Sequence, residues 1–191
     1  MTKKVDLKLI LAVIAAGLLS FCGVIVETAM NITFPVLMRQ FSINTATVQW
    51  LTTAYLLVVA IIVPISAFLK RRFPTKGLFV TANLLFIAGL LVDASASRFW
   101  VLVLGRVIQG LGTGIALPLM FNIILDWVPD EQKGTLMGVG TLITAIAPAL
   151  GPTFGGLVIS RLGWHWIFIL LLPSVSYTHL RAHEKELHLV C

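Results

Sequence analysis

Residues 145–156 read A-I-A-P-A-L-G-P-T-F-G-G, with two prolines and three glycines inside an otherwise apolar run. Such residues are tolerated in the middle of a membrane helix, because neighbouring helices satisfy the freed backbone groups. Ala147, Gly151 and Gly155 recur every four residues and share one face, where small side chains let a second helix approach closely. The adjacent row carries the two prolines, which are expected to bend the helix: Pro148 and Pro152.

The composition indicates a membrane protein. Hydrophobic residues make up 58% of the 191 residues and charged residues 12%, and the mean hydropathy is +0.98. A net charge of +6 would suggest nucleic-acid binding in a soluble protein. Here the basic residues lie in short gaps between apolar runs, which is a pattern of membrane topology. The two cysteines, Cys22 and Cys191, indicate neither a disulfide framework nor a metal site, and we expect no nucleic-acid partner, metal or cofactor.

Five apolar runs are long enough to span a bilayer, which takes about 20 residues each. A sixth run begins at Trp166 and is interrupted. The first run is too long for a signal peptide, and four more spans follow it. The expected fold is an all-α polytopic membrane protein, with spans at about 9–34, 47–69, 77–96, 100–125, 135–160 and, incomplete, 166–173.

The basic residues of the loops predict the orientation. They concentrate before the first span and between the second and third spans: Lys3, Lys4 and Lys8, then Lys70, Arg71, Arg72 and Lys76. The alternate loops carry only Arg39, Arg98 and Arg161. Because an excess of positive charge marks the cytoplasmic side, we expect the N-terminus and the loop with Lys70, Arg71 and Arg72 to be cytoplasmic.

The last residues, 174–191, are polar although a sixth span should be under way. Reverse-translated, residues 175–184 can be written as a transposon adapter of sequencing libraries, and residues 189–191 fit the bases that follow the index in such adapters. Lys185 departs from that match. We interpret the segment as a translated adapter, with a genuine polar tail as the alternative. The native chain is then expected to continue past Pro173.

Two ionisable side chains lie inside expected spans. Glu27 lies past the middle of the first span, and Arg106 lies in the fourth, about 10 Å from the outer face at 1.5 Å per residue. Such residues are costly in a membrane helix and usually face a partner or a water-filled path. Since both lie in the outer half of the bilayer, they can meet, and Glu27 is a candidate for proton exchange. The alternatives are a structural ion pair or, for Glu27, simple solvation.

The sequence around Arg106 is L-G-R-V-I-Q-G-L-G-T-G. Arg106, Gly110 and Gly114 share a helix face, and Gln109 is a further polar group beside it. Glycine-rich runs also bind phosphates, but a dinucleotide site needs a strand that leads into a helix of a soluble unit. The position of this run in mid-membrane excludes that interpretation.

Several stretches resemble the major facilitator superfamily. Residues 105–110, G-R-V-I-Q-G, look like its span-four signature G-R-x-x-Q-G, and residues 151–156, G-P-T-F-G-G, look like its antiporter motif G-P-x-x-G-G. Residues 50–57 and 163–168 resemble the drug:proton antiporter branch with fourteen spans. Residues 27–35, E-T-A-M-N-I-T-F-P, are similar to that branch's span-one motif. The resemblance covers essentially the whole chain before the polar tail.

The resemblance implies the N-terminal six-helix half of a major facilitator fold, truncated in its sixth span. It implies a multidrug efflux antiporter that works by alternating access, with a proton gradient as its energy source. The expected partners are the lipid bilayer of a bacterial plasma membrane, protons, small amphipathic drugs or toxic cations, and the missing C-terminal half of the same chain.

The same resemblance assigns roles to individual residues. The candidates for proton or substrate coupling are Glu27, Arg106, Gln109 and Asn31. The residues of the span-four motif are Gly105, Gly110 and Gly114. The bending, leak-sealing helix of span five carries Pro148, Gly151, Pro152, Gly155 and Gly156.

The loop after the second span departs from the family pattern G-x-L-x-D-R-x-G-R. Residues 66–73, S-A-F-L-K-R-R-F, keep a basic cluster but lack the glycine and the aspartate. In the family this loop latches the inward side during transport. The sequence therefore does not predict the usual charge partnership, and Arg71 or Arg72 is the candidate to pair with the loop that carries Asp126 and Asp130.

Other functions remain open at this point. An uptake permease of the same superfamily would share the fold, although the antiporter run argues against it. A non-transporting membrane sensor or scaffold would tolerate the loss of Glu27. An enzyme is disfavoured, because His165 is the only histidine outside the tail and no Ser/His/Asp or metal-spaced set is present. His165 is expected at the outer interface, between Trp164 and Trp166.

Overall fold

The computed structural model describes residues 7–181, with side chains from residue 9 to residue 176. Lys3 and Lys4, and residues 182–191 of the polar tail, lie outside the described residues. Within that range every regular element is a helix, which confirms the all-α prediction. The helices are α1 (Leu7–Phe41), α2 (Thr45–Val48), α3 (Trp50–Arg72), α4 (Thr75–Ala94), α5 (Phe99–Trp127), α6 (Asp130–Arg161) and α7 (His165–Arg181).

The breaks between helices follow residues that favour a turn or a helix start. Pro74 directly precedes α4, and Pro129 directly precedes α6. Proline lacks the backbone N–H, but at the start of a helix this group has no partner within the helix, so no hydrogen bond is lost. Gly163 lies between α6 and α7 with φ +93, a conformation that glycine adopts without steric cost. Asn44 caps α2, because its side chain accepts a hydrogen bond from the Thr47 backbone N–H at 2.8 Å.

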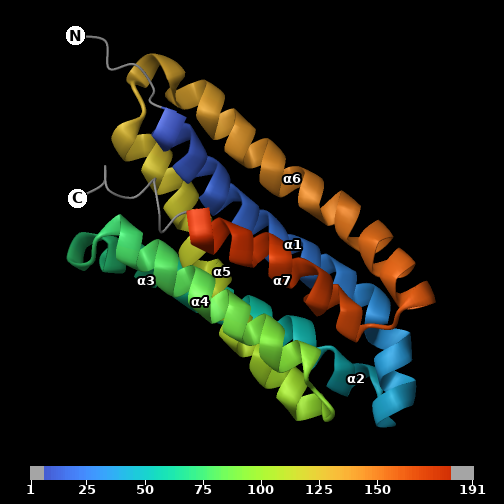
Figure 1. Ribbon diagram of the computed structural model, residues 1–191. Helices are drawn as coiled ribbons and strands as arrows, with labels where there is room; N and C mark the ends of the chain where they lie inside the picture. Colours follow the sequence, from blue (N-terminus) through green and yellow to red (C-terminus); the bar gives the residue numbers. More distant parts are fainter. Residues whose placement is uncertain (1–6, 182–191) are drawn as a thin grey trace.

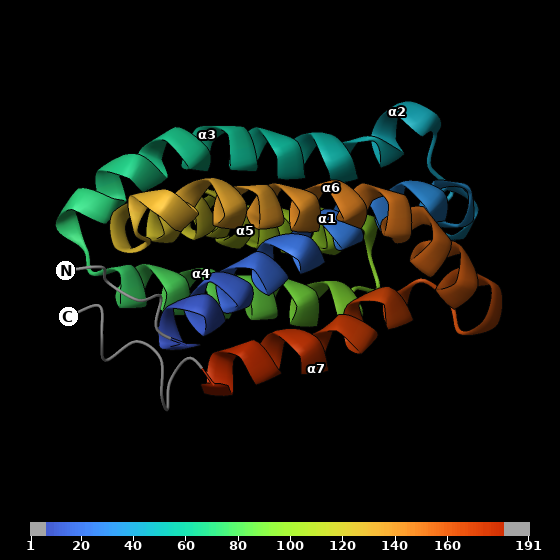
Figure 2. The same ribbon diagram turned by 90° about the horizontal axis from the view of Figure 1, so that it is seen from above.

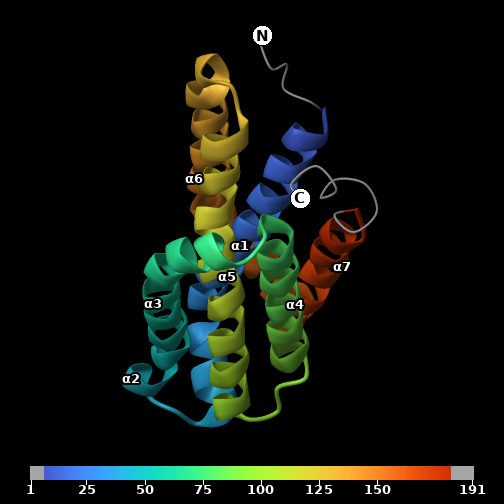
Figure 3. The same cartoon turned by 90° about the vertical axis from the view of Figure 1, so that its left-hand side faces the viewer.

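Helices α1 and α5 form the centre of the bundle. Helix α5 packs against α3, α4 and α1, and α1 packs against α6, α5 and α7. Figure 1 shows α1 between α6 and α7. In Figure 2, α3 and α7 lie on opposite sides of the bundle, and in Figure 3, α5 lies between α3 and α4. Polar side chains at the contacts of the central helices are therefore shielded, as in the fully buried Arg106 and Gln109 of α5.

Five helical segments in the described range are long and apolar enough to cross a membrane: Leu9–Phe41, Thr45–Arg72, Thr75–Ala94, Phe99–Trp127 and Asp130–Arg161. Each overlaps one of the five spans expected from the sequence. A shorter apolar helix covers His165–Ser176, where the incomplete sixth span is expected. Since α7 continues through Pro173 to Arg181, the backbone does not mark the expected end of native sequence, and the interpretation of residues 174–191 stays a prediction.

The small-residue face of α6 packs against α1. Ala147, Gly151 and Gly155 are all buried. A Cβ atom added to Gly151 would meet the Thr28 hydroxyl, and one added to Gly155 would lie 3.0 Å from the Ala29 Cα. The close approach that the spacing predicts is therefore confirmed. Helix α6 runs through both of its prolines as one continuous helix, and the expected bend stays a prediction.

The α1–α6 contact predicts an asymmetry between two glycines of α6. In the full-length protein, Gly151→Leu should lower the stability by about 1–3 kcal/mol, because the added side chain has to displace Thr28. Gly156→Leu is the matched control, since a Cβ there meets nothing within 4 Å. Thermal unfolding of both variants in detergent checks this. Equal melting temperatures for the two variants would contradict the packing.

Candidate functional site

A chain of polar contacts links α3, α4 and α5 inside the bundle, towards the end where α4 leads into α5. The Arg106 guanidinium is fully buried and lies 4.1 Å from the centre of the Tyr55 ring, within range of a cation–π attraction. Arg106 Nη1 donates to Gln109 Oε1 at 2.7 Å, and Gln109 Nε2 donates to Asp93 Oδ2 at 2.7 Å. Tyr55 in turn donates its hydroxyl to the Gly23 carbonyl of α1 at 3.3 Å. All four helices of the site thus meet around one cation.

The chemistry of the partners fixes the orientation of the Gln109 amide. A guanidinium has donors and no acceptor, so the amide atom that faces Arg106 has to be the oxygen. The amide nitrogen then faces Asp93, which accepts the hydrogen bond. Gln109 is therefore a directional bridge between a cation on α5 and a carboxyl on α4.

The site has unused hydrogen-bonding capacity. Arg106 Nε and Nη2 and Asp93 Oδ1 are buried without a hydrogen-bond partner among the described residues. Buried polar groups usually have partners, and leaving one unpaired costs about 1–3 kcal/mol. Such a site is suited to take up a further polar ligand, a water molecule or a proton.

Glu27 belongs to the electrostatic surroundings of Arg106. Its side chain is half-buried on α1 and interacts electrostatically with the Arg106 charge. Within residues 9–176, the ion pairs closer than 4 Å are Lys70–Asp126 and Lys133–Asp130. Glu27 and Arg106 thus interact electrostatically without an ion pair closer than 4 Å. The sequence predicts that the two side chains can meet, and it leaves open whether they pair directly.

Glycines let the neighbouring helices approach Arg106. A Cβ atom on Gly105 would collide with the Asp93 carboxyl. Gly110 and Gly114 face α3, where an added Cβ would lie 3.0 Å from the Tyr55 carbonyl oxygen and 2.7 Å from the Ile62 Cβ. The sequence predicts one common helix face for Arg106, Gly110 and Gly114. In the structure, this face of α5 contacts α3. Gly105 has a different neighbour, α4.

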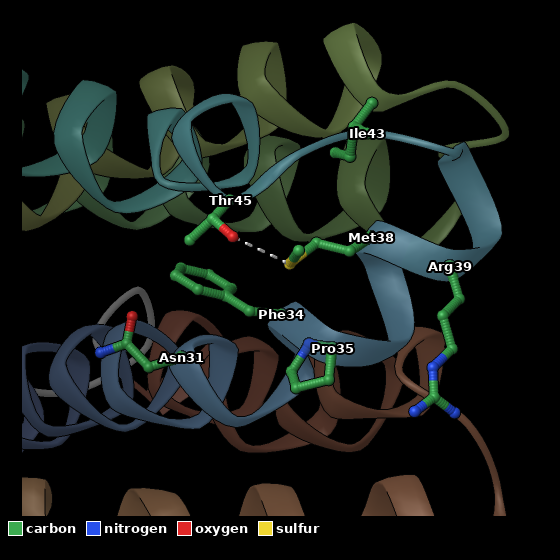
Figure 4. A pocket seen from close by; sticks show the side chains of 7 residues that line it. All are labelled: Asn31, Phe34, Pro35, Met38, Arg39, Ile43 and Thr45. Atoms are coloured by element: carbon green, nitrogen blue, oxygen red, sulfur yellow. Dashed lines mark hydrogen bonds between the residues drawn. The ribbon is translucent and has the colours of Figure 1, made fainter.

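Asn31 lies one helical turn beyond Glu27, at the edge of a hollow. Its side-chain oxygen accepts a hydrogen bond from the Thr52 hydroxyl of α3 at 2.9 Å. The hollow has a volume of about 660 Å³, and Figure 4 shows its lining: Asn31, Phe34, Pro35, Met38, Arg39, Ile43 and Thr45. The lining mixes apolar side chains with one cation, so it does not complement a cationic drug by charge.

At the end of the bundle that carries the basic loop, Lys70 pairs with Asp126 at 2.5 Å. This contact joins the ends of α3 and α5. The sequence offers Arg71 or Arg72 for such a pairing, but Lys70, one residue earlier on the same last turn of α3, makes it instead. Asp130 pairs within its own helix, with Lys133 at 2.7 Å.

At the opposite end, Trp164 docks inside the bundle. It is 2% exposed, and its Nε1 donates to Gln40 Oε1 at 2.7 Å. The His165 Nε2 lies 3.3 Å from the Ala96 carbonyl oxygen, and Trp166 is 41% exposed. Trp164 is thus a packing residue that bonds the exposed Gln40 side chain, whereas Trp166 is exposed. The position of His165 at the outer interface stays a prediction.

Sequence reasoning identified Glu27, Arg106 and Gln109 but missed Asp93 and Tyr55. The signal for Asp93 was available: it is an ionisable residue inside the third expected span, the same feature that singled out Glu27. Tyr55 lies in residues 50–57, one of the stretches that resemble the antiporter branch. Its side chain is neutral, so the sequence gave no reason to expect a contact between its ring and a cation.

Comparison with known proteins identifies the class. The profile of the Major Facilitator Superfamily matches residues 16–175. The chain is 46% identical over 156 residues to the lincomycin resistance protein LmrB of Bacillus subtilis (strain 168), covering 82% of this chain and 33% of the relative. It is 28% identical over 185 residues to the multidrug export protein EmrB of Haemophilus influenzae, covering 94% and 36%.

A solved structure shows the same fold. The crystal structure of a bacterial homologue of the human lysosomal transporter Spinster, in an inward-facing and unoccupied conformation, matches with a TM-score of 0.78 at 17% identity. The match covers 98% of this chain and 44% of that chain. The apolar helices and the profile together define a multi-pass membrane protein. The chain belongs to the major facilitator superfamily, and it spans about a third of the length of the curated relatives it matches.

The Lys70–Asp126 contact predicts a charge-dependent coupling between α3 and α5. In the full-length protein, Lys70→Asp and Asp126→Lys should each destabilise, and the double variant should recover part of the loss. The coupling energy should be about 0.2–1 kcal/mol, because both side chains are partly exposed. A double-mutant cycle of thermal unfolding measures it. A coupling that is zero at low salt would contradict the pairing.

Proposed function

We propose that the full-length protein is a proton-coupled multidrug efflux antiporter, of which this chain forms most of the N-terminal six-helix half. The observation that carries the proposal is the fully buried Arg106, with two free nitrogen atoms and the half-buried Glu27 as a charged neighbour. A carboxyl inside an expected membrane span, beside a buried cation, can exchange a proton for a cationic group of a substrate. The names of the relatives, lincomycin resistance and multidrug export, support drug efflux.

Glu27 is the leading residue for coupling in this proposal. When Glu27 is ionised, Arg106 stabilises it, because a nearby cation favours the carboxylate. When Glu27 takes up a proton, Arg106 loses that counter-charge and Gln109 remains its hydrogen-bond acceptor. The substrates would be amphipathic drugs or toxic cations, and the part of the chain absent here would supply the other half of their cavity.

The close contact between α1 and α6 supports a mechanism of alternating access. The α1–α6 contact places glycine against Thr28 and Ala29 of α1, directly after Glu27. A movement of α6 would therefore act on the helix that carries the coupling carboxyl. Two halves that rock about a central site are the general way in which such transporters work.

Two alternative functions predict different results from this proposal. An uptake permease would share the fold and the span-four motif, but deleting its gene would lower the cellular content of the substrate instead of raising it. A non-transporting sensor or scaffold would keep its function without Glu27.

We also infer that the protein is a transporter without enzymatic activity, since its family is one of transporters.

The coupling role of Glu27 predicts a selective loss. In the full-length protein, Glu27→Gln should abolish proton-driven efflux and leave expression intact, because the amide cannot exchange a proton. Drug accumulation in energised cells measures it. Glu131→Gln is the matched control, as Glu131 is exposed at the start of α6. Undiminished efflux of every substrate by Glu27→Gln would refute the role.

We further propose that the N-terminus and the basic loop are cytoplasmic, because of the positive charge at that end of the bundle. A cysteine introduced for Lys76 should then react with a membrane-impermeant maleimide only in inverted vesicles. A cysteine introduced for Ser97 should react only in intact cells. The reverse labelling pattern would overturn the orientation.

A further inference from the structure

Two carboxyl groups from different helices share one buried cation. Glu27 of α1 and Asp93 of α4 each interact electrostatically with Arg106. Asp93 is fully buried, and its link to Arg106 runs through the Gln109 amide. Oδ1 of Asp93 has no hydrogen-bond partner among the described residues. A buried carboxylate with a free oxygen and no direct ion pair is unfavourable unless it is compensated.

The charges of the three groups do not balance when both carboxyls are ionised. Arg106 contributes +1, and Glu27 and Asp93 contribute −1 each, which leaves −1 in a site where Arg106 and Asp93 are fully buried and Glu27 is half-buried. One proton on either carboxyl brings the total to zero, and so does one bound monovalent cation. A buried site of this kind therefore favours one proton or one cation, and the proton is shared by the pair of carboxyls.

Other titratable groups around Asp93 do not provide the missing positive charge. Tyr55 of α3 is neutral and donates its hydroxyl to Gly23. His165 of α7 is bound to the Ala96 carbonyl oxygen beyond the end of α4. Arg98, in the loop after α4, is exposed. Arg106 is thus the buried cation on which both carboxyls depend within the described residues.

We propose that Asp93 is a second proton-carrying group of the transporter, coupled to Glu27 through Gln109 and Arg106. The inference rests on the proposed efflux function and extends it to a residue that the span-one and span-four motifs do not contain. A lipophilic monovalent cation binds to the protonated, neutral group of three side chains. One proton leaves the Glu27–Asp93 pair for water, and the total charge of the site stays zero.

The geometry suggests a substitution of Asp93 that removes its titratable proton and keeps its hydrogen bond with Gln109. Asn at position 93 has the size of Asp, and its side-chain oxygen can still accept from Gln109 Nε2. The site tolerates no increase in bulk, because the carboxyl lies directly on Gly105. In Asp93→Asn, the single carboxylate Glu27 balances Arg106, and no proton remains to be released.

The experiment measures proton release when tetraphenylphosphonium is added to the purified full-length protein in weakly buffered detergent with a pH-indicator dye. The unchanged protein should release about one proton per bound cation. Asp93→Asn and Glu27→Gln should each release close to none. Asp130→Asn, a matched change at an exposed site, should behave like the unchanged protein. Release by Asp93→Asn equal to that of the unchanged protein would overturn the proposal.

A measurement on the unchanged protein covers the case in which Asp93→Asn does not fold. Infrared difference spectra are recorded on addition of tetraphenylphosphonium, with and without ¹³C in the aspartate side-chain carboxyls. The proposal predicts that a protonated carboxyl band which shifts with this label is lost on cation binding. A response confined to unlabelled glutamate bands would overturn it.

Efflux assays separate this inference from the proposed function. If the unchanged protein exports no drug in energised cells, the proposed function fails. If it exports drugs, Glu27→Gln abolishes export and Asp93→Asn exports with an unchanged dependence on pH, the function stands and Asp93 has no part in coupling. Loss of pH dependence in Asp93→Asn supports the inference.

Discussion

The burial of the Arg106 guanidinium is the constraint on which the rest of the bundle depends. A charge far from water needs compensation from every helix within reach. Here α3 offers the Tyr55 ring, α4 offers Asp93 through Gln109, and α1 offers Glu27 at longer range. The glycines of α5 follow from the same need, because α3 and α4 can supply these groups only if their backbones come close.

This arrangement gives each position of the span-four motif a physical reason. Gly105 leaves room for the Asp93 carboxyl, and Arg106 is the cation itself. Gln109 is the amide that bridges the cation on α5 and the carboxyl on α4, since its oxygen can only accept and its nitrogen can only donate. Gly110 lets the backbone of Tyr55 approach. The motif therefore describes one polar cluster with its packing, and changing any member alters the surroundings of the cation.

The packing and the polar site are joined through α1. On one side this helix contacts the glycines of α6, and on another it carries Glu27 towards the buried cation. The far ends of the bundle are held by different interactions, the Lys70–Asp126 pair at one end and the buried Trp164 at the other. The charged groups are thus shared by several helices, while separate contacts join the ends of the bundle.

The sequence by itself determined the helices, the small-residue faces of α5 and α6, and the presence of Glu27 and Arg106 inside long apolar helices. Helical periodicity and apolar run length are local properties, so they can be read from the chain. Only the tertiary structure decided that Gln109 bridges to Asp93, that Lys70 and not its arginine neighbours pairs with Asp126, and that Trp164 is buried. Periodicity gives the face of each helix, whereas the rotation and depth of one helix against another depend on packing of the whole bundle.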